Sequence, residues 1–128
     1  MILLLDTSTP TCRLSLIDGD QRYDTEWVAD RQLAHGLLLF LNDQLAMHGW
    51  TWADLSGLGV YRGPGSFTGL RIGLTILNTL ADSLAVPIIG TDGDAWQNRA
   101  LTALKEGNND RIVLPLYDRD ANITTPRK

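Results

Sequence analysis

The chain has 128 residues, of which 44% are apolar and 20% charged, a composition that suits one globular domain and excludes an intrinsically disordered chain. Its net charge of −4 gives no electrostatic case for direct binding of nucleic acid. The apolar runs at residues 2–5 and 37–41 are too short for a signal peptide or a bilayer span, so we expect a soluble, cytoplasmic protein with no membrane partner.

Three strands are expected at the start of the chain. Residues 2–6 form an apolar run that leads into the turn formers of residues 6–10, Asp-Thr-Ser-Thr-Pro. Residues 11–17 alternate in part and end at Asp18-Gly19, which is a hairpin signal, and residues 21–28 alternate again. This pattern predicts an antiparallel meander.

Two long helices are expected next, from about Gln32 to Met47 and from Ser66, as N-cap, to about Leu84. Both are apolar over more of their surface than one core face requires. In the first helix Leu38 and Leu39 widen the apolar arc, and in the second a side stripe is small or apolar: Gly69, Ile72, Gly73, Ile76 and Leu80. Two interpretations stay open, namely packing within the domain and an interface with another chain whose backbone approaches Gly69 and Gly73.

The remaining elements complete an α/β pattern. Strands are expected at residues 55–61 and 86–91, and a third helix at about 95–105, capped by Asp92 or Asp94. The order predicts a mixed five-stranded sheet flanked by helices over residues 1–110. Residues 111–117 look like a final strand and residues 118–128 like a tail.

A glycine-rich stretch, Arg62-Gly-Pro-Gly-Ser-Phe-Thr-Gly-Leu-Arg-Ile-Gly73, stands between the strand at 55–61 and the second helix. Its glycines, its proline and the N-cap serine suit a tight strand-to-helix turn, which either holds an anion on its N–H groups or holds nothing. The carboxylate of Asp6 either contacts phosphate and orients magnesium or caps an Asx turn. The candidate phosphate or nucleotide contacts are Asp6, Thr7, Ser8, Gly63, Gly65 and Ser66.

No catalytic residue or metal site is predicted. His35 and His48 are not at a metal-pairing spacing and have no acidic residue at zinc-ligand spacing. The single cysteine, Cys12, excludes an internal disulfide, lacks a nearby base and is interpreted as a small buried hydrophobic residue. The lysine of a P-loop is also missing after the glycine-rich turn.

The glycine-rich stretch resembles the bacterial TsaB (YeaZ) family, as do Leu5-Asp-Thr-Ser-Thr9, the helix entry with His35 before Leu37-Leu38, and Pro87-Ile-Ile-Gly90. The likeness runs from residue 1 to about residue 97 and implies the first half-domain of the actin-like, Hsp70-like and sugar-kinase fold, which is ribonuclease H-like. Gly36 and Arg13 depart from the usual family pattern. Family members usually carry a second half-domain, and a shortened chain and a naturally minimal one both remain open.

The resemblance implies a non-catalytic scaffold in the tRNA processing that forms threonylcarbamoyladenosine. Such a subunit binds and activates a TsaD-like catalytic subunit, joins a TsaE-like ATPase, meets tRNA only indirectly, and can form a dimer with itself through the same helices. The implied interface residues are Leu38, Leu39, Gly69, Ile72, Gly73, Ile76 and Leu80. No intrinsic cofactor is expected, and ATP or ADP with magnesium would occupy a site shared within the complex. The alternative hypothesis is a nucleotide-binding phosphotransferase half-domain of the sugar-kinase class, using Asp6 and residues 63–66 on phosphate.

Overall fold

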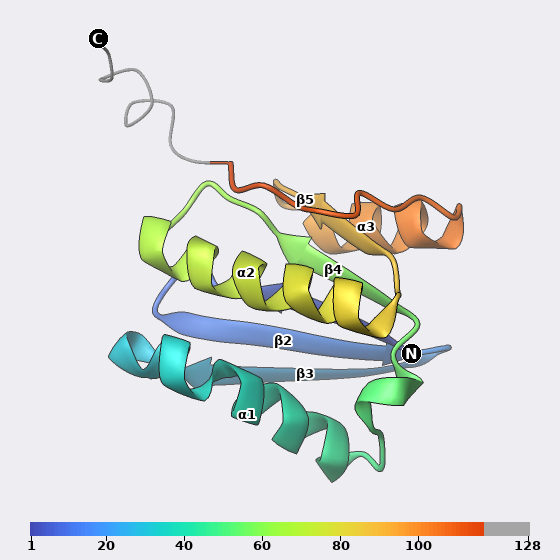
Figure 1. Cartoon of the computed structure of the whole chain (residues 1–128), viewed down its shortest axis with the longest axis horizontal. Coiled ribbons are helices and arrows are strands. Elements are labelled where there is room, and N and C mark those ends of the chain that lie inside the picture. The colour runs from blue at the N-terminus through green and yellow to red at the C-terminus, as the bar shows by residue number, and fades with distance from the viewer. Residues whose placement is uncertain (117–128) are drawn as a thin grey trace, which may run out of the picture.

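Five strands form one mixed sheet in the computed structural model, which describes residues 1–116 (Figure 1). The strands are β1 (Ile2–Asp6), β2 (Thr11–Asp18), β3 (Gln21–Val28), β4 (Gly57–Tyr61) and β5 (Ile88–Thr91). Their order across the sheet is β3-β2-β1-β4-β5. β2 pairs antiparallel with both β1 and β3, whereas β4 pairs in parallel with both β1 and β5. The predicted meander and the mixed five-stranded sheet are confirmed.

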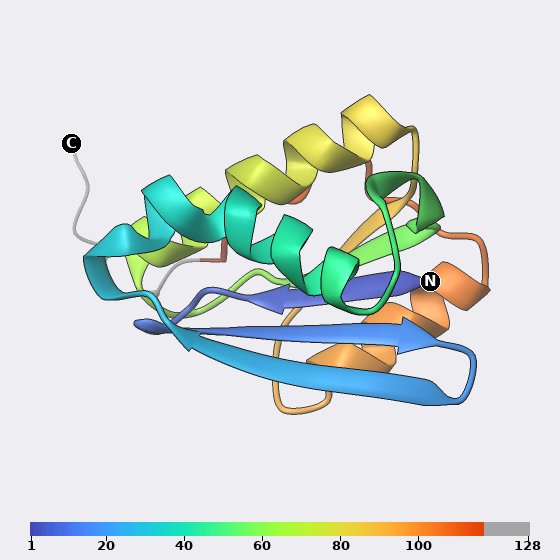
Figure 2. The ribbon, with the colours of Figure 1, turned by 90° about the horizontal axis from the view of Figure 1, so that it is seen from below.

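Helices cover both faces of this sheet. α1 (Leu33–Met47) and α2 (Phe67–Leu84) form one layer, and α3 (Trp96–Lys105) lies on the opposite face (Figure 2). Short 3-10 helices at Asp30–Gln32 and Trp52–Asp54 precede α1 and β4. Among residues 1–116, no helix combines the length and apolar character that crossing a membrane requires.

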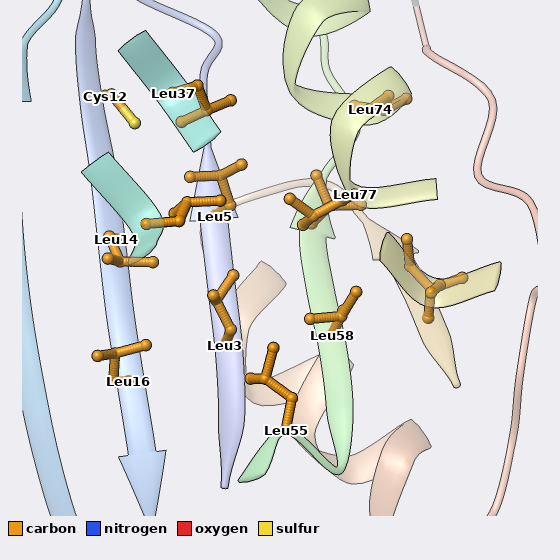
Figure 3. Close-up of a cluster of buried hydrophobic side chains, with 14 of the residues drawn as sticks. Leu3, Leu5, Cys12, Leu14, Leu16, Leu37, Leu55, Leu58, Leu74 and Leu77 are labelled. Carbon is orange, nitrogen blue, oxygen red and sulfur yellow. The ribbon is translucent and has the colours of Figure 1, made fainter. Parts of the chain in front are cut away.

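The main core lies between the sheet and the α1/α2 layer. Side chains of β1 alternate between the two faces, so Leu3 and Leu5 join the main core while Leu4 packs toward α3. All three are fully buried because both faces of this central strand are covered. Leucines from both helices meet those of the strands in the main core, among them Leu37, Leu74 and Leu77 (Figure 3).

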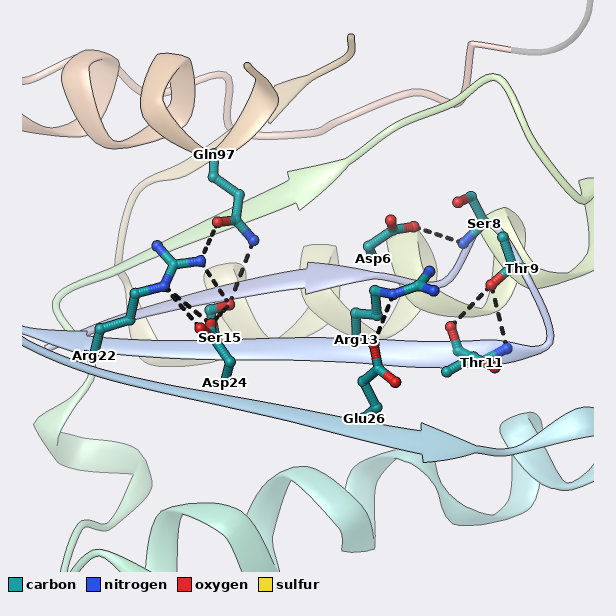
Figure 4. Close-up of polar contacts among 10 residues, drawn as sticks. All are labelled: Asp6, Ser8, Thr9, Thr11, Arg13, Ser15, Arg22, Asp24, Glu26 and Gln97. Carbon is teal, nitrogen blue, oxygen red and sulfur yellow. Dashed lines mark hydrogen bonds and ion pairs between the residues drawn. The ribbon is translucent and has the colours of Figure 1, made fainter. Parts of the chain in front are cut away.

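The two departures from the family pattern have local explanations. The Trp27 ring stacks on Phe40 of α1, with ring centroids 5.1 Å apart. A Cβ at Gly36 would come within 2.8 Å of the Trp27 ring, so a side chain there would push the indole away. On the other face of the meander, which α3 leaves partly open, Arg13 pairs with Glu26 at 3.1 Å (Figure 4).

The predicted final strand is wrong for its described part, since residues 111–116 form no strand. Side chains take the edge of β5 instead: the Ile88 N–H donates to Asn109 Oδ1 at 3.0 Å, and the Gly90 N–H donates to Asp110 Oδ2 at 2.9 Å. These amides are therefore not available to a sixth strand. Tyr117 lies outside the described residues.

Asn78 of α2 fixes the segment after Asp110 to the body of the domain. Its side-chain amide accepts from the Val113 N–H at 2.8 Å and donates to the Val113 carbonyl at 3.0 Å. Val113 is buried in the main core, and a Cβ on Gly90 would collide with its side chain. The described part of this segment thus shares the core of residues 1–110.

Replacing Asn78 with alanine should release this segment. We expect the free energy of unfolding to fall by about 2 kcal/mol, because two partly buried hydrogen bonds are lost at about 1 kcal/mol each. Hydrogen exchange at the Val113 amide and urea unfolding would measure the effect. Thr79→Ala is the matched control, since among residues 1–116 the Thr79 hydroxyl bonds only to its own helix, at the Thr75 carbonyl. Unchanged protection of the Val113 amide would contradict the prediction.

Candidate functional site

The loop between β1 and β2 is bonded to the first turns of α2. Ser66 is the N-cap of α2, as predicted, and its hydroxyl accepts from the Gly69 N–H at 3.3 Å. The Ser66 N–H in turn donates to the Ser8 carbonyl at 2.8 Å. The Thr7 hydroxyl, which is fully buried, donates to the Gly69 carbonyl at 2.7 Å. The glycine-rich stretch therefore joins α2 to the end of β1.

Gly69 and Gly73 face Thr7 of the same chain. A Cβ at Gly69 would lie far inside contact distance of the Thr7 carbonyl oxygen, and one at Gly73 would collide with the Thr7 hydroxyl. Both glycines are buried within the domain. The prediction that another chain approaches α2 at these two glycines is therefore wrong, and any side chain introduced at Gly73 would disturb the fold before it reached an interface.

The candidate phosphate contacts are largely used by the chain itself. Asp6 Oδ1 accepts from the Ser8 N–H at 2.8 Å, which confirms the Asx-turn interpretation (Figure 4). Ser8 is buried and occupies the space that a side chain at Gly65 would need. At Gly63, where φ is +121°, a Cβ would likewise collide with the carbonyl oxygen of Leu116. With the Ser66 N–H bonded to the Ser8 carbonyl and the Thr7 hydroxyl bonded to the Gly69 carbonyl, several of the predicted phosphate contacts are engaged within the chain.

Asp92 joins the carboxyl ends of β4 and β5 to α3 through ion pairs. Its carboxylate lies 3.5 Å from the guanidinium of Arg62 and 3.6 Å from that of Arg99. The prediction that Asp92 or Asp94 caps α3 is wrong, because the N-cap position is Ala95 and no side chain caps it. Among the described residues, no group of three or more His, Cys, Asp or Glu side chains is arranged to hold a metal ion.

Cys12 is fully buried on β2, as predicted. Burial, with a smaller contribution from the Asp6 carboxylate, raises the pKa of its thiol to about 12. A protonated, enclosed thiol is a poor nucleophile.

The folded protein should therefore resist a thiol reagent such as DTNB at pH 8 and react after unfolding in guanidinium. The folded state keeps the Cys12 proton to about pH 12, whereas an unfolded thiol loses it near pH 8.5. The contribution of this group to stability should accordingly fall as the pH rises between these values. Fast labelling of the native chain would contradict this placement.

The outer side of the α1/α2 layer exposes apolar side chains. Leu38 and Leu39 of α1 are 51% and 63% exposed, and three residues of α2 are half-buried beside the core. We call this surface the helix face: Leu38, Leu39, Ile72, Ile76 and Leu80. Between the two helices lies a groove of about 300 Å³, lined by Ala34, Thr68, Arg71, Ile72, Thr75 and Ile76. The apolar pattern of the sequence identified all five residues of the helix face. It missed four residues that line the groove, Ala34, Thr68, Arg71 and Thr75, because their polarity or small size gave no apolar signal.

The sequence of this chain matches a family of tRNA-modification proteins. A family model described as TsaD, tRNA N6-adenosine threonylcarbamoyltransferase, matches residues 27–93, just over half of the chain. The matched region contains α1, the glycine-rich stretch, α2 and β5.

Curated relatives and solved structures agree with the family model. The chain is 32% identical to the tRNA threonylcarbamoyladenosine biosynthesis protein TsaB of Escherichia coli strain K12, over 94% of this chain and 56% of that protein. It is also 32% identical to TsaB of Bacillus subtilis strain 168, over 91% of this chain and 49% of that protein. YeaZ from Pseudomonas aeruginosa superposes with a TM-score of 0.68 at 31% identity, covering 83% of this chain and 49% of that one.

These likenesses concern one part of the relatives, since the chain spans about half the length of the curated proteins it matches. Within that part, the shared fold is the actin-like, ribonuclease H-like half-domain that the sequence predicts. The chain therefore belongs to the TsaD-type family, and over most of its length it is similar to part of the TsaB (YeaZ) proteins.

Proposed function

We propose that this chain is a non-catalytic scaffold subunit in the formation of tRNA threonylcarbamoyladenosine, and that it binds and activates a TsaD-like catalytic subunit. The observation that carries the proposal is the exposed apolar helix face. Leu38 and Leu39 are more than half exposed although the core beneath them is already closed by Leu37 and Leu41. Exposed apolar side chains gathered on one surface are typical of a protein interface.

The shape of the partner follows from the family relationship. A TsaD-like protein belongs to the same family as this chain, and the match to the TsaD model includes both helices of the helix face. Two related helix pairs can pack against each other as a four-helix arrangement. The same surface suits a homodimer, which would compete with the heterodimer for it.

Further parts of the proposal concern the assembly as a whole. We place a TsaE-like ATPase in the same complex, tRNA in contact with the other subunits, and the complex in the cytoplasm. ATP or ADP with magnesium would bind only where a partner completes the site, because Thr7, Ser8 and the Ser66 N–H are engaged within this chain. The same contacts disfavour the alternative of a phosphotransferase half-domain.

Light scattering tests the proposal directly. The chain, a TsaD-like protein and their mixture would be measured separately, and we expect the mixture to contain a one-to-one complex. Threonylcarbamoyl transfer to tRNA by the TsaD-like protein, assayed with its other partners, should rise when the chain is added. Unchanged masses in the mixture would overturn the scaffold function. Calorimetry with ATP and magnesium tests the alternative, which tight binding by the isolated chain would support.

A further inference from the structure

Arg71 lines the groove in the helix face and, among residues 1–116, forms no ion pair. Arg31 and Arg111 also form none, but neither of them lines this groove. The helix that carries Arg71 offers no acid nearby: the one acidic residue of α2, Asp82, is eleven residues further on, about 16 Å along the helix axis.

The guanidinium of Arg71 contacts an aromatic ring of its own helix. Its central carbon lies 5.4 Å from the centroid of the Phe67 ring, one turn earlier on α2. Such a cation–π contact restrains the side chain while leaving its N–H donors available to a second group. Arg71 thus presents a positive charge beside a groove that includes the apolar side chains of Ala34, Ile72 and Ile76.

A partner seated on this surface would remove water from Arg71. A charge that is taken out of water without an opposite charge costs several kcal/mol. An apolar partner surface alone would therefore be opposed by the arginine next to the groove it fills. A carboxylate on the partner removes this penalty and can accept two N–H bonds from the planar guanidinium.

We propose that the partner helix bound to the helix face carries an aspartate or glutamate that pairs with Arg71, next to an aliphatic side chain that fills the groove. This inference rests on the proposed function and specifies the chemistry of the partner at that site. The alternative anion, a tRNA phosphate, would leave the apolar groove unfilled, so the geometry favours a protein carboxylate.

The salt dependence of binding tests the pair. The dissociation constant of the complex with the TsaD-like protein would be measured from low salt to about 1 M NaCl, where charges are screened within about 3 Å. We expect Arg71→Gln to weaken binding at least about 10-fold at low salt and to remove much of the salt dependence. Arg71→Lys keeps the charge but loses the planar guanidinium, so its affinity should lie between those of the wild type and Arg71→Gln. Lys105→Gln makes the same charge change on α3, on the far side of the sheet, and should bind like the wild type.

Charge reversal identifies the partner residue. Arg71→Glu should abolish binding, and changing one acidic residue on the partner's contacting helix to arginine should restore it. Circular dichroism confirms that each variant folds. The inference is overturned if Arg71→Gln binds with the wild-type affinity and salt dependence, or if no reversed pair recovers binding. It is also overturned if the change weakens only the binding of tRNA. None of these results contradicts the scaffold function. The scaffold function fails only if the wild-type chain does not bind the TsaD-like protein at all.

Discussion

Gly69→Ala should lower the free energy of unfolding by about 3 kcal/mol, even though alanine favours a helix by about 1 kcal/mol over glycine. The new methyl group would collide with the carbonyl oxygen of Thr7. That oxygen belongs to the backbone of a loop whose next residue, Ser8, is bonded to Ser66, so it cannot move away alone. Urea unfolding followed by circular dichroism would measure the loss, together with a melting temperature lower by about 10 °C.

Gly73→Ala provides the matched comparison, because its nearest neighbour is the side chain of Thr7. Removing that side chain with Thr7→Ala should partly rescue Gly73→Ala and leave Gly69→Ala unrescued, since the carbonyl remains. A double-mutant cycle separates the two cases. A Gly69→Ala protein as stable as the wild type, or equal rescue of both variants, would contradict the packing described for Thr7.

Ile76→Asp should weaken binding of the TsaD-like protein more than about 100-fold while leaving the monomer folded. Ile76 is half-buried and lines the groove of the helix face. A carboxylate placed there would be enclosed against the aliphatic side chain that the partner inserts into the groove, and it would compete with the partner's own carboxylate for Arg71, which together should cost several kcal/mol. Calorimetric titration would measure the binding, and circular dichroism the fold.

The control for Ile76→Asp is Asn98→Asp, which adds the same charge at an exposed position in the first turn of α3. It should bind like the wild type. Leu38→Asp, on the other helix of the pair, should reproduce the loss. If Ile76→Asp and Leu38→Asp both bind normally, the partner uses another surface.

The sequence predicted those parts of the structure that depend on near neighbours. The N-cap at Ser66 and the Asx turn at Asp6 form between residues two or three apart, so their side chains are enough to predict them. The periods of the apolar residues likewise located α1, α2 and the meander.

The errors arose where contacts join distant parts of the chain. A glycine in a helix indicates that something comes close but does not say what, and the Thr7–Gly69 contact spans 62 residues. Residues 111–116 have the composition of a strand, yet Asn109 and Asp110 already occupy the edge that it would join. Such competition between side chain and backbone is not visible in a local pattern.

The bonds that hold α2 also influence how a partner would bind. Thr7 and Ser8 fix its first turns to the sheet, and Asn78 fixes its middle to Val113. Ordering a mobile backbone on binding would cost about 1–2 kcal/mol of conformational entropy per residue, and α2 has that order before any encounter. Association through this helix should therefore proceed as rigid-body docking, with rate constants of about 10⁵ to 10⁷ M⁻¹ s⁻¹ and no slow folding phase.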